Sequence, residues 1–183
     1  MNEIADKPAD IVAFWRGVGP KGWFKRNVAL DAEIRRCFLG LHERAADGAL
    51  GAWEASAEGA LALLILLDQF PRNMFRGIPR AFATDAAARG VAECAIRASF
   101  DGAIPGMRGF FYLPFMHSES LADQERGIAL YTACGDADGA KWARVHADII
   151  RRFGRFPHRN AILGRVSTPE EAAFLGAAGG FSA

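Results

Sequence analysis

The chain has 183 residues, of which 51% are hydrophobic and 23% are charged. This balance excludes an intrinsically disordered chain, and the length fits one domain over residues 1–183. The formal net charge of +1 excludes strong attraction of the whole protein to nucleic acid or to a membrane. Alanine occurs 35 times, whereas Ile, Val and Thr occur only 11, 6 and 3 times, a composition typical of helices.

Apolar residues at helical spacing predict a series of helices in the first half of the chain. The predicted helices start near Pro8 and run from about Asn27 to Asp47, from Ser56 to Phe70 and from Thr84 to Ser99. The third should be the most buried, because it is apolar on all sides from Ala60 to Leu67. We expect Pro71 to end it, since the residue before a proline avoids the helical conformation.

The second half continues the same pattern. A short helix follows Pro105, and further helices run from Ser120 to about Cys134, from Asp136 to about Phe153 and from Ser167 to Gly176. The segments 120–123 and 167–170 both read as capping boxes. Because the turns are short, we expect an all-α fold of about eight helices stacked as antiparallel pairs into a superhelix like that of tetratricopeptide repeats.

The cysteine pattern and the length of the apolar runs bear on the cellular compartment of the protein. Cys37, Cys94 and Cys134 lie far apart and form no C-x-x-C motif, so we expect reduced, buried, inert thiols in a cytoplasmic protein. The longest unbroken apolar run, residues 59–67, is too short to span a bilayer. No membrane partner is therefore expected.

One short motif occurs twice. Phe70-Pro71-Arg72-Asn73 recurs as Phe156-Pro157-His158-Arg159-Asn160, with one residue inserted. Both copies follow an apolar helix. The motif can be shared punctuation, in which Phe seals a helix end, Pro stops the helix and Asn caps the next element. It can also be a repeated anion site, in which an arginine and a helix N-terminus face one concave surface.

Several long segments resemble a known family. They are residues 67–77 (LDQFPRNMFRG), 81–85 (AFATD), 112–119 (YLPFMHSE), 122–126 (ADQER), 152–160 (RFGRFPHRN) and 167–171 (STPEE). Together they are similar to the uncharacterised bacterial family catalogued as domain of unknown function 924, and the similarity covers nearly the whole chain. The resemblance implies an all-α fold of the tetratricopeptide-like superfamily. It implies no activity.

Asp68 is the first candidate site residue. It is predicted in the last turn of the most buried helix, where the helix dipole disfavours an anion, so it needs a cationic partner. Arg72, four residues on, and Arg159 in the second copy of the motif are the possible partners. Asp68 is then either half of a buried ion pair that locks helix ends or a ligand-binding carboxylate.

Glu125 is the second candidate. On a helical wheel Gln124 and Glu125 fall on the side of Leu121 and Ile128, so both are expected to point toward the core. Asp123 has the separate task of the capping acid. An inward glutamate must be paired or protonated, which makes Glu125 a candidate for a perturbed pKa.

The helix after Asp136 carries two stripes. Lys141, Arg144, Asp148, Arg151 and Arg155 form one, and Trp142, Val145, His146, Ile149, Ile150 and Phe153 form the other. His146 should therefore face the core and Asp148 the solvent. Residues 141–165 hold seven Lys or Arg against one acid, with phenylalanines between them, which leaves RNA binding open. The near-zero net charge argues against nucleic acid as the main partner.

No metal or cofactor is expected. His117, His146 and His158 lie in separate elements, and no metal-binding, nucleotide-binding or serine-hydrolase motif occurs. The leading hypothesis is a binding or adaptor module for a peptide or a small anionic ligand, with a groove lined by Asp68, Arg72, Asn73, His117, Glu125, Arg155, His158, Arg159 and Asn160.

Three alternatives remain. A hydrolase or lyase would use Glu125 with His117 or His158 as general acid and base. RNA binding would use the 141–165 stripe. A structural subunit would expose an apolar patch around Trp15, Trp23 and Phe24. The sequence leaves the oligomeric state open.

Overall fold

The computed structural model describes residues 6–177, and these residues form helices and turns with no strand. The predicted all-α fold is confirmed. The chain divides into two compact units. Unit 1 comprises Met1–Arg76 and Arg80–Pro114, and unit 2 comprises Gly77–Pro79 and Phe115–Ala183. Each unit is described by itself. Within residues 6–177, no helix is both long enough and apolar enough to cross a bilayer.

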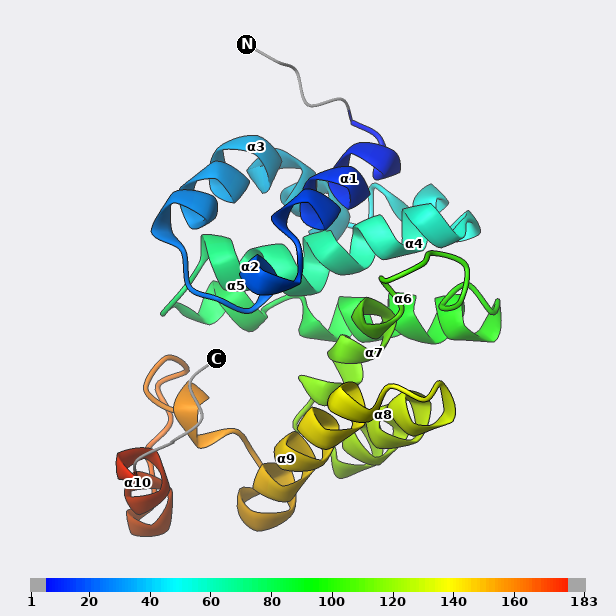
Figure 1. Cartoon of the computed structure of the whole chain (residues 1–183). Coiled ribbons are helices and arrows are strands. Elements are labelled where there is room, and N and C mark those ends of the chain that lie inside the picture. The colour runs from blue at the N-terminus through cyan, green and yellow to red at the C-terminus, as the bar shows by residue number, and fades with distance from the viewer. Residues whose placement is uncertain (1–5, 178–183) are drawn as a thin grey trace. The chain divides into compact units, whose positions relative to one another are not determined.

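Unit 1 is built around one long helical rod. The rod consists of α4 (Ala57–Leu64), the π-helical turn η2 (Ile65–Gln69) and α5 (Phe70–Met74). Figure 1 shows α4 between α1 (Pro8–Val18) and α6 (Asp85–Arg97), while α3 (Val28–Ala46) packs on α5. The remaining elements are α2 (Pro20–Trp23), η1 (Gly51–Ala55), η3 (Pro79–Phe82), which starts in unit 2, and α7 (Gly109–Met116), which ends in unit 2. Residues 60–67 are each at most 3% exposed, so the predicted burial of this helix is confirmed.

The prediction that Pro71 ends the third helix is wrong. Pro71 lies in the first turn of α5, and the rod continues through it. A proline inside a regular α-helix clashes with the carbonyl group four residues earlier, here that of Leu67. The π turn avoids this clash, because the Phe70 N–H reaches back to the Ile65 carbonyl and shifts the ladder by one residue.

Side chains satisfy the carbonyl groups that the π turn and Pro71 release. The Leu66 oxygen accepts from His42 Nδ1 at 2.9 Å, so this ring nitrogen carries the proton. The Leu67 oxygen accepts from Thr84 Oγ1 at 2.5 Å. Thr84 is the N-cap residue of α6, as predicted, but its hydroxyl makes this bond and no capping bond.

Unit 2 contains one close helix pair. The helices α8 (Leu121–Ala133) and α9 (Ala137–Phe153) are joined by a short turn and pack side by side (Figure 1). The turn η4 (Pro157–Arg159) and α10 (Pro169–Gly176) follow. The second capping box is formed by Thr168 and Glu171, one residue later than predicted. The stacking of further pairs into a superhelix stays a prediction.

Several predicted orientations need correction. Trp142 and Val145 are exposed, although the apolar stripe of α9 placed them in the core. Trp15 is fully buried, so it cannot belong to a surface patch. Cys94 is exposed, although a buried thiol was expected. By contrast, His146 is buried and Asp148 is exposed, as predicted.

Candidate binding site

Asp68 forms a buried ion pair in unit 1. This residue is 1% exposed, and its Oδ1 lies 3.2 Å from Nη1 of Arg72. The same nitrogen lies 3.0 Å from Asp85 Oδ1 and donates to the Asp68 carbonyl at 2.6 Å. Burial alone lowers the pKa of the Arg72 guanidinium, but the two carboxylates raise it above its usual value. Of the two predicted partners for Asp68, Arg72 forms the pair, and the structural interpretation accounts for this residue.

Asn73 belongs to a second polar contact in unit 1. Its Nδ2 donates to Asp31 Oδ1 at 2.8 Å, and the guanidinium of Arg76 binds both oxygens of the same carboxylate at 2.9 and 3.0 Å. Burial raises the pKa of Asp31, but the hydrogen bonds from Arg76 and Asn73 outweigh it and hold this pKa below its usual value. We call this arrangement the unit 1 clamp.

Unit 2 repeats the arrangement with different residues, which we call the unit 2 clamp. Asn160 Nδ2 donates to Glu171 Oε2 at 3.2 Å, and Arg155 binds both oxygens of Glu171 at 2.7 and 2.9 Å. The backbone N–H of Thr168 donates to the same carboxylate. The hydrogen bond from Arg155, followed by that from Thr168, lowers the pKa of Glu171 to about 2.

The two clamps explain the asparagine of the repeated motif. Each copy buries its phenylalanine and uses its asparagine to bind a carboxylate that an arginine already holds. The anion at each clamp is therefore a carboxylate of the chain itself, Asp31 in unit 1 and Glu171 in unit 2. The asparagine of each copy is thus architectural, although its side chain caps no helix.

We expect Asn73→Asp and Asn160→Asp each to destabilise their own unit by about 1–3 kcal/mol, because each replaces a buried donor by a second acceptor beside a carboxylate. Urea unfolding measures the change. Asn27→Asp is the control: Asn27 caps the exposed start of α3, where aspartate caps equally well. A variant of either clamp as stable as this control would contradict the interpretation.

The fold brings the three candidate histidines of unit 2 into electrostatic reach of one another. His146 is buried and His158 is partly exposed. Burial, followed for His158 by the charge of Arg159, lowers the pKa of each to about 4. His117 and Arg159 are linked directly, since Arg159 Nη2 donates to the His117 carbonyl at 2.9 Å. His146 and His158 are therefore neutral at pH 7. In the described part of the chain, no three His, Cys, Asp or Glu side chains could hold a metal ion together.

The expectation for Glu125 is wrong. Its side chain is 59% exposed on α8, and its carboxylate lies 3.8 Å from Arg151. Gln124 takes the buried position instead and donates to the carbonyls of Met116 and Ser118 at 2.7 and 2.6 Å. Adjacent helical residues differ by about 100° in direction, so a helix that buries Gln124 turns Glu125 outward.

Two acids that matter in unit 2 were missed as site residues. Glu119 binds both terminal nitrogens of Arg165, at 2.7 and 3.0 Å, and accepts the Phe156 N–H at 2.8 Å. Glu171 forms the unit 2 clamp. Both lie within segments that resemble the family, but their partners are distant in sequence, and helical spacing carries no signal for such pairs.

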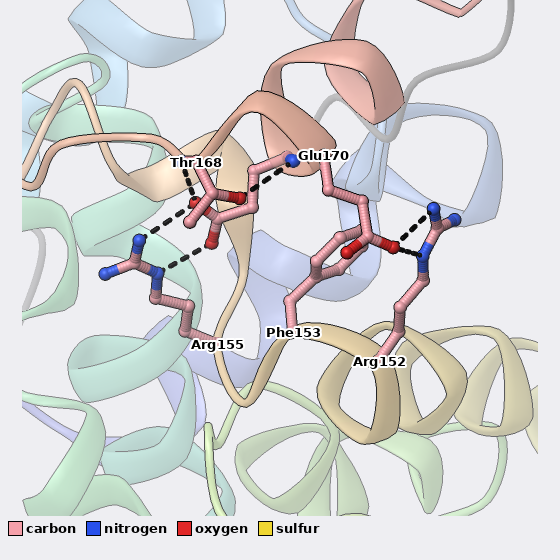
Figure 2. Close-up of a pocket in the computed structure, with 6 residues that line it drawn as sticks. Arg152, Phe153, Arg155, Thr168 and Glu170 are labelled. Carbon is pink, nitrogen blue, oxygen red and sulfur yellow. Dashed lines mark hydrogen bonds and ion pairs between the residues drawn. The ribbon is translucent and has the colours of Figure 1, made fainter.

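A depression of about 370 Å³ opens between the end of α9 and the start of α10. It is lined by Arg152, Phe153, Arg155, Thr168, Glu170 and Glu171. Figure 2 shows Phe153 between the two arginines, each of which turns toward a carboxylate. Of the predicted site residues, Arg155 lines this depression. Asn160 does not line it but donates a hydrogen bond to Glu171, which does.

The two ion pairs of the depression differ in strength. The Arg155–Glu171 pair is bidentate and its carboxylate is buried. Arg152 and Glu170 meet at 2.8 Å with side chains 53% and 62% exposed. An exposed pair of this kind contributes about 1 kcal/mol or less, because water competes for both groups. The Arg152 guanidinium also lies 4.7 Å from the ring centre of Phe153 and 5.9 Å from that of Phe174.

The chain matches the model of a family described as "Bacterial protein of unknown function (DUF924)" over residues 11–179. It is also similar to a solved structure of a protein of unknown function from Agrobacterium tumefaciens. The two sequences are 47% identical, and the match covers 92% of this chain and 96% of the other, with a TM-score of 0.89. No curated protein matches the chain.

Proposed function

The chain belongs to the DUF924 family of bacterial proteins of unknown function, and we propose that it is a binding module whose unit 2 holds the carboxylate end of a peptide. The proposed site is the depression between α9 and α10. One observation carries the proposal: Arg152 lies on an aromatic surface, and its ion-pair partner within residues 6–177 is the exposed carboxylate of Glu170. A ligand carboxylate would replace Glu170 on this arginine.

The chemistry of the depression suits such a ligand. An arginine binds a carboxylate through two parallel hydrogen bonds, which gives both strength and direction. Phe153 and Phe174, whose ring centres are 5.1 Å apart, offer an apolar surface for the side chain next to the carboxylate. The unit 2 clamp forms a fixed wall, because its arginine and its glutamate hold each other. Of the two arginines that line the depression, Arg152 is then the one available to exchange partners.

The alternatives receive less support. The proposed hydrolase or lyase needed an inward Glu125, and this residue lies on the exposed side of α8 beside Arg151. The RNA hypothesis needed a continuous basic stripe. Three of its cations are instead engaged inward: Arg155 with Glu171, Arg165 with Glu119, and Arg159 with a backbone carbonyl.

Isothermal titration tests the proposal with a short peptide that ends in a phenylalanine carboxylate and with the same peptide as its C-terminal amide. We expect the free carboxylate to bind at least about tenfold more tightly, since a charge-assisted hydrogen bond contributes about 1.5–3 kcal/mol. Arg152→Gln should remove this preference. Glu170→Gln should increase affinity, because it removes the internal competitor.

Arg151→Gln is the matched control. Arg151 precedes Arg152 on α9 and forms a similar exposed pair, with Asp148, but it does not line the depression. This variant should bind the peptide like wild type. Equal binding of acid and amide, or equal losses in both arginine variants, would refute the proposed site.

We also propose a reducing compartment, such as the cytoplasm, as the site of action. Cys37, Cys94 and Cys134 are all free thiols, and Cys94 is exposed. An exposed thiol persists where thiols are kept reduced. Fractionation of the source cells, with mass spectrometry of the thiol state, tests this expectation.

A further inference from the structure

The segment from Lys21 to Val28 combines exposed apolar side chains with an excess of positive charge. We call it the basic loop. Lys21, Lys25 and Arg26 in this segment are exposed, as is Arg16 in α1, and residues 16–30 contain no acid. Within it, Phe24 and Val28 are 72% and 70% exposed. This local excess of positive charge is not apparent from the net charge of the whole chain, which is +1.

Packing holds the basic loop in this form. The indole N–H of Trp23 donates to the Trp15 carbonyl at 2.6 Å, and Trp15 itself is fully buried. Phe110 supports both neighbouring rings of the loop. Trp23 meets it edge-on at 4.9 Å between ring centres, and Phe24 stacks on it at 6.4 Å with 21° between the ring planes. Phe24 therefore stays exposed on a packed aromatic base.

We propose that the basic loop docks the protein reversibly on an anionic lipid surface. The exposed side chains of Phe24 and Val28 would enter the region between headgroups and acyl chains, and the surrounding cations would remain at the level of the phosphates. Each lysine or arginine near an anionic leaflet adds attraction that salt weakens. Two apolar side chains and a few cations support reversible association and do not anchor the protein permanently.

Two other occupants fit the loop less well. A second copy of this chain would bring the same cations against themselves in a two-fold interface, which costs energy. A nucleic acid would bind through bases stacked on open aromatic faces. Here Phe24 already stacks on Phe110, and the other exposed apolar residue, Val28, has no ring on which a base could stack.

Co-sedimentation with vesicles tests this inference in the full chain. One preparation contains phosphatidylcholine alone, and the other contains equal parts of phosphatidylcholine and phosphatidylglycerol. We expect binding to the anionic vesicles only, with a steep loss at high salt. Phe24→Ser should lower the partition coefficient at least about tenfold, and Lys25→Gln about fivefold.

Matched controls lie in unit 2. Val166→Ser removes an exposed apolar side chain, and Lys141→Gln removes an exposed cation, both away from the loop in sequence. Both variants should bind vesicles like wild type, and circular dichroism checks that all four variants fold. The proposal is overturned if wild type does not bind anionic vesicles, if the controls lose as much as the loop variants, or if Phe24→Ser weakens binding to an RNA oligonucleotide but leaves vesicle binding unchanged.

Discussion

Replacing Arg72 by glutamine is expected to lower the free energy of unfolding of unit 1 by about 3–5 kcal/mol. The guanidinium lies between the carboxylates of Asp68 and Asp85, both of which are buried. Without it, two acids would face each other with little access to water. The variant also removes the hydrogen bond to the Asp68 carbonyl, next to the π turn.

Fluorescence can isolate unit 1 in this experiment. Trp142 is the tryptophan of unit 2 and is exposed on α9, so a Trp142→Phe background leaves only the tryptophans of unit 1. Urea unfolding in this background then measures unit 1. Asp68→Asn should cost less than Arg72→Gln, because Arg72 keeps Asp85 as a partner.

Arg80→Gln is the control for an exposed pair in the same unit. Arg80 binds Glu43 at 2.7 Å with side chains 44% and 51% exposed, so the loss of this pair should cost about 1 kcal/mol or less. We expect the loss in free energy of unfolding to be largest for Arg72→Gln, smaller for Asp68→Asn and smallest for Arg80→Gln. If Arg72→Gln is no more costly than Arg80→Gln, or if it stabilises the unit, the Asp68 pair is strained for a ligand and does not serve the architecture.

Helix starts could be predicted from the sequence because they depend on contacts within one turn. The side chain of Asn27 caps α3, that of Ser56 caps α4, and that of Asp136 caps α9. Each capping residue and the amide it binds are at most three residues apart. The prediction that Pro71 ends a helix failed for the opposite reason. The π turn and the Thr84 hydroxyl that accommodate Pro71 depend on tertiary packing.

The candidate site was harder to predict. The sequence indicated that Asp68 needs a cation, with Arg72 and Arg159 as the possible partners, and the local pair with Arg72 exists. The unit 1 clamp joins Asp31 to residues more than forty positions away. The pair of Glu119 and Arg165 spans a similar distance in sequence. Such pairs depend on how helices pack, which a helical wheel does not contain. The error at Glu125 has the same origin, since packing decided which of two adjacent residues turned inward.

The histidines of unit 2 predict its response to acid. Burial is the main cause that lowers the pKa of His146 from 6.5 to about 4, and the pKa of His158 falls to about 4 in the same way. Between these pH values the two histidines bind protons in the unfolded chain but stay neutral in the folded unit. The free energy of unfolding therefore falls as the pH falls. His146 alone should cost about 3 kcal/mol between pH 6.5 and pH 4, and the partly exposed His158 should add a smaller loss of the same sign.

The pH windows of these groups can be separated. Glu171, with a pKa of about 2 against the usual 4.5, contributes stability that is complete above pH 4.5 and disappears toward pH 2. A loss between pH 6.5 and pH 4.5 therefore belongs to the histidines. Urea unfolding at several pH values, followed by the amide resonances of α9, measures it for unit 2.

The variant His146→Gln/His158→Gln should flatten the dependence of unit 2 on pH in this window, whatever its stability at pH 7. His42→Gln is the control: burial lowers the pKa of His42 too, but this residue lies in unit 1, so the slope of unit 2 should not change. A slope that persists in the double variant would place the acid sensitivity elsewhere. A slope that disappears would show that unit 2 holds two neutral imidazoles inside its fold, where Arg159 disfavours their protonation.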